Sequence, residues 1–194
     1  MRQAEIDRQN QWLIDRRNQF RAGADVVTAA WAAFPEVVAV ALTGSVAKPL
    51  WKEVPRFAPF RRKGIALWHE CMDIDLVLWL DSQERLGELR RAKDTALREA
   101  FAAIGGLATH GVDTFLFEPG SDRYLGRLCH FAQCPKGKPD CRTPGCGATA
   151  FNKVVPGFTL HRDLLAAARV LYRRDAGVVL RAVDLPTEEA EGAG

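Results

Sequence analysis

The chain has 194 residues, of which 47% are hydrophobic, 26% are charged and 9% are aromatic. This composition is typical of a soluble globular protein with one substantial core, and it argues against two full domains. A formal net charge of +3 excludes a nucleic-acid binder that relies on overall electrostatics. The longest apolar runs are far shorter than the roughly 20 residues of a membrane span, and the N-terminus lacks the apolar core of a signal peptide. We therefore expect a cytoplasmic protein with no membrane segment.

Two helices are expected within residues 4–34. Apolar residues recur every seven positions in the first of them, at Ile6, Leu13 and Phe20. This amphipathic helix is predicted to end near Gly23. Asp25 is a good N-cap for the second helix, and the proline at position 35 ends it.

The middle of the chain predicts three strands. The run VVAVAL (37–42) is short and apolar on both faces, as a strand buried between two layers is, and MDIDLVLWL (72–80) and VDTFLF (112–117) follow it. Leucines at helical spacing predict a helix over 83–104, and HRDLLAAARVLYRR (161–174) predicts another. We therefore expect an α/β (α+β) fold with a small mixed β-sheet and helices packed on one side. It forms one domain over residues 1–182, followed by a flexible tail over 183–194.

Two carboxylates share one face of the strand predicted over 72–80. Asp73 and Asp75 alternate with apolar residues, so their backbones lie roughly 6 to 7 Å apart on the same side, close enough to converge on one or two hard divalent ions. Asp113 begins the strand predicted over 112–117 and offers a third carboxylate. The alternative is that these acids lie exposed at the rim of the sheet and bind nothing.

Gly44 and Ser45 follow directly after the first predicted strand. Glycine lets a ligand approach the backbone, and the free amides of a following helix would point at an anion, so this junction suits phosphate. The same residues also suit an ordinary turn with a helix cap.

Three segments in this order, ALTGSVAKPL, CMDIDLVLWL and GVDTFLF, resemble the nucleotidyltransferase superfamily of the DNA polymerase β type, particularly its small bacterial members. The resemblance spans residues 26–118. It implies that Gly44 and Ser45 open a helix and hold the nucleotide's terminal phosphates. It also implies that Asp73 and Asp75 bind two magnesium ions, with Asp113 as a third ligand and candidate base.

The chain departs from the family pattern at two places. Lys48 stands where many small members have arginine, which keeps a cation for a phosphate contact, and Pro49 replaces the usual glycine. Asp73 follows Ser45 by 28 positions, roughly twice the spacing in compact members, so residues 48–66 form a basic insertion. If this insertion flanks the carboxylate cleft, three of its aromatic residues could stack on bases: Trp51, Phe57 and Phe60. The alternative is that the insertion is a solvated loop surface.

The resemblance implies an NTP substrate, with ATP expected, and transfer of the nucleoside monophosphate to an acceptor hydroxyl with release of pyrophosphate. The acceptor is a small molecule, an RNA end or a protein hydroxyl. Two alternatives of other classes stay open. One is a non-catalytic, antitoxin-like protein that uses the same fold to bind a partner, and the other is a zinc-stabilised nucleic-acid-binding module.

Four of the five cysteines lie in the segment 121–147, which is rich in glycine and proline. They are Cys129, Cys134, Cys141 and Cys146, with four, six and four residues between them. Four soft ligands at this spacing suit a structural tetrahedral zinc ion, and His130 is a possible substitute ligand. The alternative is four reduced thiols or a redox pair.

The remaining histidines and the fifth cysteine receive no functional role. Isolated histidines at 69, 110 and 161 are more often satisfied or exposed side chains than catalysts. Cys71, just before the aspartate pair, is interpreted as a core residue rather than a nucleophile.

Overall fold

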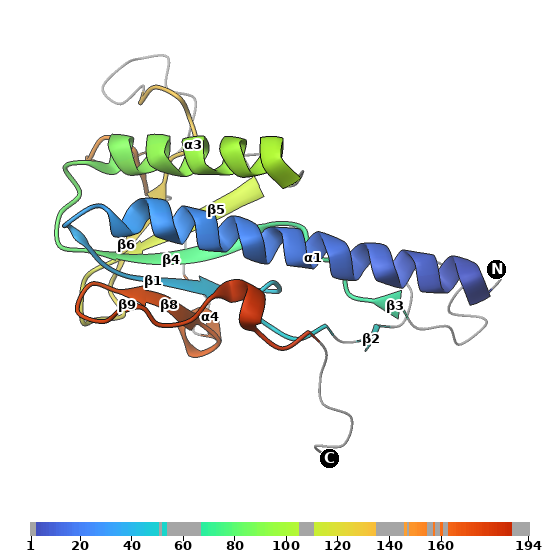
Figure 1. Cartoon of the computed structure of the whole chain (residues 1–194). Coiled ribbons are helices and arrows are strands. Elements are labelled where there is room, and N and C mark those ends of the chain that lie inside the picture. Colours follow the sequence, from blue (N-terminus) through green and yellow to red (C-terminus); the bar gives the residue numbers. More distant parts are fainter. Residues whose placement is uncertain are drawn as a thin grey trace.

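The computed structural model describes residues 3–50, 52–53, 67–104, 111–134, 146, 148–154, 157, 160 and 163–187. Figure 1 shows these elements as two long helices above one large sheet. The elements are, in chain order, α1 (Gln3–Ala32), β1 (Val37–Thr43), β2 (Lys52–Glu53), β3 (Leu67–Trp68), β4 (Ile74–Leu80), α3 (Leu86–Ile104), β5 (Val112–Phe117), β6 (Tyr124–Leu128), β7 (Asn152–Lys153), α4 (Asp163–Ala166), β8 (Arg169–Arg173), β9 (Gly177–Val178) and the 3-10 helix η2 (Ala182–Asp184).

The large sheet is mixed and has seven strands in the order β7-β6-β5-β4-β1-β8-β9. Its central strands β4 and β5 run parallel, while every other neighbouring pair is antiparallel. A separate two-stranded sheet joins β2 to β3. The expected mixed α/β architecture is therefore confirmed, and the three strands predicted from the middle of the chain are β1, β4 and β5.

The main core lies between the sheet and the helices α1 and α3. Val40, Leu42 and Leu76 are fully buried on this side, as alternation along β1 and β4 requires. The fully buried Trp31 of α1 donates from Nε1 to the carbonyl oxygen of Leu89 at 2.9 Å, which ties α1 to α3. Burial of an indole whose N–H is satisfied fixes the angle between the two helices.

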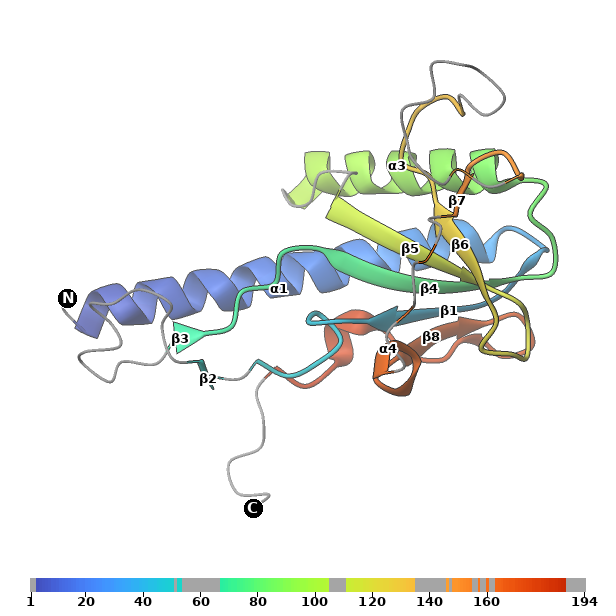
Figure 2. The ribbon, with the colours of Figure 1, turned by 180° about the vertical axis from the view of Figure 1, so that it is seen from behind.

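The opposite face of the sheet carries a smaller apolar cluster. Its buried members are Ala41, Val77, Phe115 and Phe117. Leu164 and Leu165 at α4 pack against this cluster, and Figure 2 shows α4 on the side of the sheet away from α3. The predicted one-sided arrangement thus holds for the two long helices only, because the short α4 covers the second face.

The two helices predicted within residues 4–34 are one continuous helix, α1. Gly23 does not interrupt it. A Cβ atom at this position would lie 3.1 Å from Cδ1 of Ile74 and 3.6 Å from Cδ2 of Leu97, so glycine serves the close approach of α1 to the sheet and to α3. Asp25 is likewise not an N-cap of α1. Its carboxylate accepts hydrogen bonds from the backbone of η2 instead, at the other end of the chain.

The helix predicted over 161–174 is wrong. Within its described part, only the four residues of α4 are helical, and β8 replaces the remainder. Leu171 and Tyr172 are buried in the main core, and Val170 packs on the second face. The free edge of β1 supplies backbone hydrogen bonds to this segment, and that pairing overrides a helical sequence preference.

Three further segments differ from the sequence prediction or lie outside the description. Residues 183–187, predicted as part of the tail, include the last two residues of η2 and the buried Leu185. The segment 121–147, predicted to be irregular, contains β6. The insertion 48–66 contains β2, while residues 51 and 54–66 lie outside the described residues, as do 188–194.

We expect Gly23→Val to lower the free energy of unfolding by about 1–3 kcal/mol, because the added methyl groups collide with Ile74 and Leu97 where the helix cannot retreat. Ala102→Val on α3 is the matched control, since Ala102 is exposed and loses only about 0.5 kcal/mol of helix propensity. Urea unfolding measures both. Equal losses in the two variants would contradict the close packing at Gly23.

Candidate metal centre

Strand alternation and register bring the three predicted aspartates to one place. Asp75 lies on the same face of β4 as Val77, which belongs to the apolar cluster on the face opposite α1 and α3, and Asp73 directly precedes the strand. In the parallel pairing of β4 with β5, Asp75 lies opposite Asp113. In the antiparallel pairing with β1, Asp75 lies opposite Thr43. The sheet therefore fixes all three carboxylates on the same face.

The three aspartates form a compact cluster. Each offers one carboxylate oxygen, and these atoms all lie within 4.8 Å of one another. All three residues are partly buried. Among the described residues, this is the one group of three or more histidine, cysteine, aspartate or glutamate side chains that meets so closely. Carboxylate oxygens at this separation are the donor set that Mg²⁺ and other hard divalent ions prefer.

Crowding of like charges perturbs the acidity of this cluster. Burial, followed by the neighbouring carboxylates of Asp73 and Asp113, raises the pKa of Asp75 to about 7. The pKa of Asp73 is also raised, first by burial and then by Asp113. In both cases a carboxylate pays for desolvation and for repulsion by its neighbours. A divalent cation between the three groups would remove both penalties.

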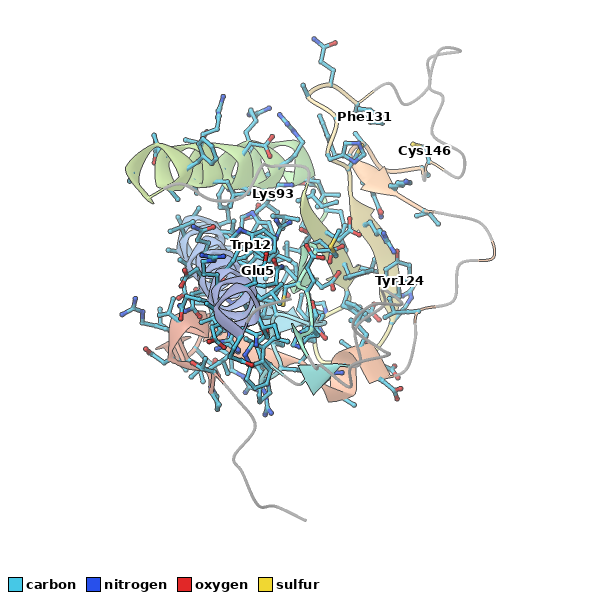
Figure 3. All side chains as sticks on the ribbon, turned by 90° about the vertical axis from the view of Figure 1, so that its right-hand side faces the viewer. Glu5, Trp12, Lys93, Tyr124, Phe131 and Cys146 are labelled. Atoms are coloured by element: carbon cyan, nitrogen blue, oxygen red, sulfur yellow. The ribbon has the colours of Figure 1, made fainter. Side chains whose placement is uncertain are left out.

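Arg127 on β6 is a site residue that the sequence analysis did not find. Its Nη1 donates to Oδ2 of Asp113 at 3.0 Å, and its guanidinium lies 4.7 Å from the ring centre of Phe115. The positive charge lowers the pKa of Asp73 and Asp75, against the effects described above. The signal was hidden because YLGRL has a glycine at its centre and was not predicted as a strand. Figure 3 shows the nearby Tyr124 on the side of the sheet away from Lys93 and α1.

Gly44 brings the end of β1 against the metal centre. Its φ of 70° lies in the left-handed region, and a Cβ atom there would overlap Oδ2 of Asp75 and lie 3.0 Å from its Cγ. Any other residue at this position would therefore be strained and would displace the carboxylate. The group that closely approaches the backbone of Gly44 in the structure is the side chain of Asp75.

The residues after Gly44 form a turn, and the helix implied by the resemblance is absent from the described residues 44–50. Lys48 is exposed, and its backbone N–H donates to the carbonyl oxygen of Ser45 at 3.3 Å. The Ser45 hydroxyl forms a hydrogen bond with the thiol of Cys71. Ser45 and Lys48 thus follow closely after Gly44, which contacts the aspartate cluster. The described residues 44–50 do not form the helix N-terminus that would bind an anion.

Cys71 is buried in the main core, as predicted, and burial raises the pKa of its thiol. The buried His69 lies beside it, with Nε2 3.6 Å from Sγ. His110 and His161 lie outside the described residues, and so do Trp51, Phe57 and Phe60.

Three of the four clustered cysteines are described, and their backbones converge on residues 151–153. The buried Cys129 donates its backbone N–H to Phe151 O at 2.8 Å, Phe151 N donates to Sγ of Cys134 at 3.2 Å, and Cys146 forms an isolated bridge with Lys153. Figure 3 shows Cys146 well away from α1. These three sulfur atoms do not meet as closely as the aspartates do, and Cys141 lies outside the described residues. Zinc binding here stays a prediction.

A cavity of about 680 Å³ lies elsewhere on the same side of the sheet. Its walls include Ala39, Trp79, Val170 and Arg173. Trp79 is four positions along β4 from Asp75, so this cavity is at the opposite end of the strand and does not contain the carboxylates. The aspartate cluster is accordingly separate from this cavity.

Comparison of the chain with protein-family models, with curated proteins and with solved structures finds no match in any of the three. The function is therefore inferred from the geometry of the site and from the sequence motifs. In the part of the chain that is described, no helix has both the length and the apolar character needed to cross a bilayer.

The metal-free protein is expected to lose stability as the pH rises from 3.8 through about 7. The sign follows because the folded-state pKa of Asp75 lies above its unfolded value, so the folded chain holds a proton that it must release over this interval. At pH 8 in EDTA, Asp75→Asn should raise the free energy of unfolding by on the order of 1 kcal/mol, because it removes one of three crowded charges. Mg²⁺ should then stabilise the wild type and not the variant.

Thermal unfolding with and without Mg²⁺ measures these effects, and Asp122→Asn provides a control at an exposed aspartate. A variant that is less stable than wild type at pH 8 in EDTA would contradict the repulsion among the carboxylates.

Protein purified without chelator should carry about one zinc ion per chain if the cysteine cluster binds zinc, as elemental analysis would show. Cys134→Ser should abolish the zinc content, because a closed four-ligand site loses most of its affinity with one ligand. Cys71→Ser leaves the cluster intact and should retain the metal. Absence of zinc from the wild type would leave these residues as reduced thiols.

Proposed function

We propose that this chain is a nucleotidyltransferase that moves a nucleoside monophosphate from an NTP, with ATP expected, to an acceptor hydroxyl and releases pyrophosphate. One observation carries the proposal: three carboxylates, from β5, from β4 and from the residue just before β4, converge within 4.8 Å beside the glycine that follows β1. The nucleotidyltransferase-like fold is part of the same proposal. It is supported by the order of the three motifs and by their positions on β1, β4 and β5.

The residues of the cluster fit a pair of Mg²⁺ ions. Only carboxylate oxygens are offered, which is the chemistry that Mg²⁺ selects. The pKa values of Asp73 and Asp75 are raised by burial and by neighbouring carboxylates, and Arg127 offsets this only in part. Asp73, Asp75 and Asp113 would hold the ions. When bound, Mg²⁺ neutralises the charge of the triphosphate and lowers the pKa of a hydroxyl that it contacts.

The side chains of the cluster would divide the remaining work. Asp75 is the innermost of the three and is fixed against Gly44, so it defines the position of the site. Asp113 has a side chain that is 46% exposed, which makes it the member best placed to meet an incoming acceptor hydroxyl and accept its proton. Arg127 holds Asp113 in place through its hydrogen bond. Positioning and charge neutralisation of this kind are what phosphoryl transfer requires from a protein.

The backbone around Gly44 supports nucleotide binding in a different way from a helix N-terminus. The turn 44–47 lies beside the carboxylates and leaves Lys48 exposed as a cation for a phosphate group. A partner-binding protein without catalysis would not need three crowded carboxylates, because the repulsion among them lowers stability. A nucleic-acid-binding module that depends on zinc would bind RNA without Mg²⁺, and filter binding in a chelator-free buffer with no added Mg²⁺ separates that alternative.

Asp73→Asn and Asp113→Asn should each reduce transfer at least a hundredfold while leaving the fold intact, because each removes one carboxylate ligand. The measurement is transfer of label from α-labelled NTPs, in Mg²⁺ and a cell extract, into small-molecule, RNA and protein fractions. Asp122→Asn is the matched control and should keep full activity. Full activity of either cluster variant would falsify the assignment of the metal centre.

Gly44→Ala should weaken binding of an NTP with Mg²⁺ about tenfold or more, because the methyl group displaces the Asp75 carboxylate. Gly120→Ala is a sharp control. Gly120 has a similar φ of 68°, so it carries the same backbone strain, but nothing lies within 4 Å of the added Cβ. Calorimetric titration should find nucleotide affinity reduced in the first variant only, and equal reductions in both would contradict the contact.

A further inference from the structure

Two arginines of α1 are buried behind the loop that follows Gly44. Arg17 and Arg21 are 0% and 1% exposed. Arg21 donates from Nε to the carbonyl oxygen of Val46 at 3.1 Å and from Nη2 to that of Lys48 at 3.2 Å. One guanidinium therefore fixes the backbone on both sides of residue 47, directly after the turn beside the metal centre.

The same guanidinium binds the C-terminal segment 185–187. Arg21 donates from Nη2 to Pro186 O at 3.0 Å and from Nη1 to Leu185 O, and Arg17 donates from Nη1 to Thr187 O. Thr187 O also accepts a hydrogen bond from Leu50 N at 2.9 Å. The loop 46–50 and the segment 185–187 are thus joined to each other and to α1 through Arg21.

Asp25, one turn further along α1, anchors the preceding residues. Its carboxylate accepts hydrogen bonds from Ala182 N at 2.6 Å and from Val183 N at 3.2 Å. Arg17, Arg21 and Asp25 lie four residues apart, so they share one face of the helix. That face of α1 therefore binds the segment 182–187, which includes η2 and the C-terminal residues 185–187.

The energetics give Arg21 more than a packing role. Burial, and then repulsion by Arg17, lower the pKa of Arg21 to about 10, which shows that its charge is costly in this place. Among the described residues, the hydrogen-bond acceptors of Arg21 are all backbone carbonyl oxygens, and these satisfy its donors without neutralising its charge. The buried positive charges of Arg17 and Arg21 therefore lie next to the loop 44–50. In the described residues 44–50 there is no helix whose N-terminus could supply positive potential to this loop.

We propose that Arg21 is a positioning residue for nucleotide binding, which holds the loop 44–50 in its binding conformation by clamping it to the C-terminal segment. Arg17 supports the clamp at Thr187. This inference rests on the proposed function for its meaning, but the clamp itself is a property of the free protein. The guanidinium fork is required because lysine lacks the planar arrangement of donors that reaches four carbonyl oxygens on two segments.

Amide hydrogen exchange followed by mass spectrometry tests the clamp without reference to activity. In Arg21→Lys and Arg21→Met, we expect exchange to accelerate at least tenfold over 44–50 and 182–187, while β4 and β5 keep their protection. Arg98→Met is the matched control. Arg98 is exposed on α3, and among the described residues it donates hydrogen bonds within its own helix, so exchange in both segments should stay at the wild-type rate.

Nucleotide titration separates positioning from general instability. Both Arg21 variants should bind a non-hydrolysable ATP analogue with Mg²⁺ about tenfold more weakly, while Mn²⁺ alone should bind the aspartate cluster with unchanged affinity. Loss of Mn²⁺ binding together with exchange throughout the sheet would show a general structural role and overturn the proposal. A wild type that binds no nucleotide would refute the proposed function, and the exchange pattern would then decide the clamp alone.

Asp25→Asn provides a second route if the Arg21 variants do not fold, because it releases the C-terminal segment and leaves the buried charges in place. Faster exchange over 182–187 should be accompanied by faster exchange over 46–50, since Leu50 and Thr187 are hydrogen bonded. Release of 182–187 with unchanged protection of 46–50 would overturn the coupling between the two segments.

Discussion

Repulsion among three carboxylates is the constraint on which the candidate site depends. The sheet register holds Asp75 opposite Asp113, and Asp73, directly before β4, adds the third carboxylate. Strand pairing therefore fixes the backbones of Asp75 and Asp113 next to each other. Burial then lifts the pKa of Asp75 to about 7. Crowding of the carboxylates lowers stability at a place where a bound cation would restore it, and this is the physical basis of the proposed metal site.

The strands that carry this site were readable from the sequence because their signal is local. Alternation in MDIDLVLWL separates an apolar face from an acidic one, and β4 follows that pattern. The segment 161–174 misled for the opposite reason. Its alanines and leucines favour a helix locally, whereas β8 owes its existence to the free edge of β1, more than 120 positions earlier in the chain. Gly23 was misjudged similarly, since its contact with Ile74 is invisible in the sequence.

The same distinction between local patterns and long-range contacts applies to the residues of the candidate site. The convergence of Asp73, Asp75 and Asp113 follows from strand periodicity and was predicted as a hypothesis. The ion pair of Arg127 with Asp113 was not, because it needs the pairing of β5 with β6. The helix expected after Gly44 is replaced by a turn, and the backbone there is satisfied by Arg21 and by the C-terminal segment instead. Sequence patterns report which groups a strand presents, whereas contacts between distant segments decide how those groups are held.

The bonds from Arg21 to Leu185 and Pro186 span 164 and 165 positions. On the ribosome, α1 and β1 emerge long before the residues that these bonds require. The strands of the sheet can pair progressively as they are synthesised. The loop beside the aspartate cluster lacks its hydrogen bonds to the C-terminal segment until synthesis has passed Thr187. Such long-range closure is slow because its entropy is lost before its contacts are gained. These long-range contacts imply an order of folding. The strands that carry the carboxylates can pair first, and the loop beside them is fixed last.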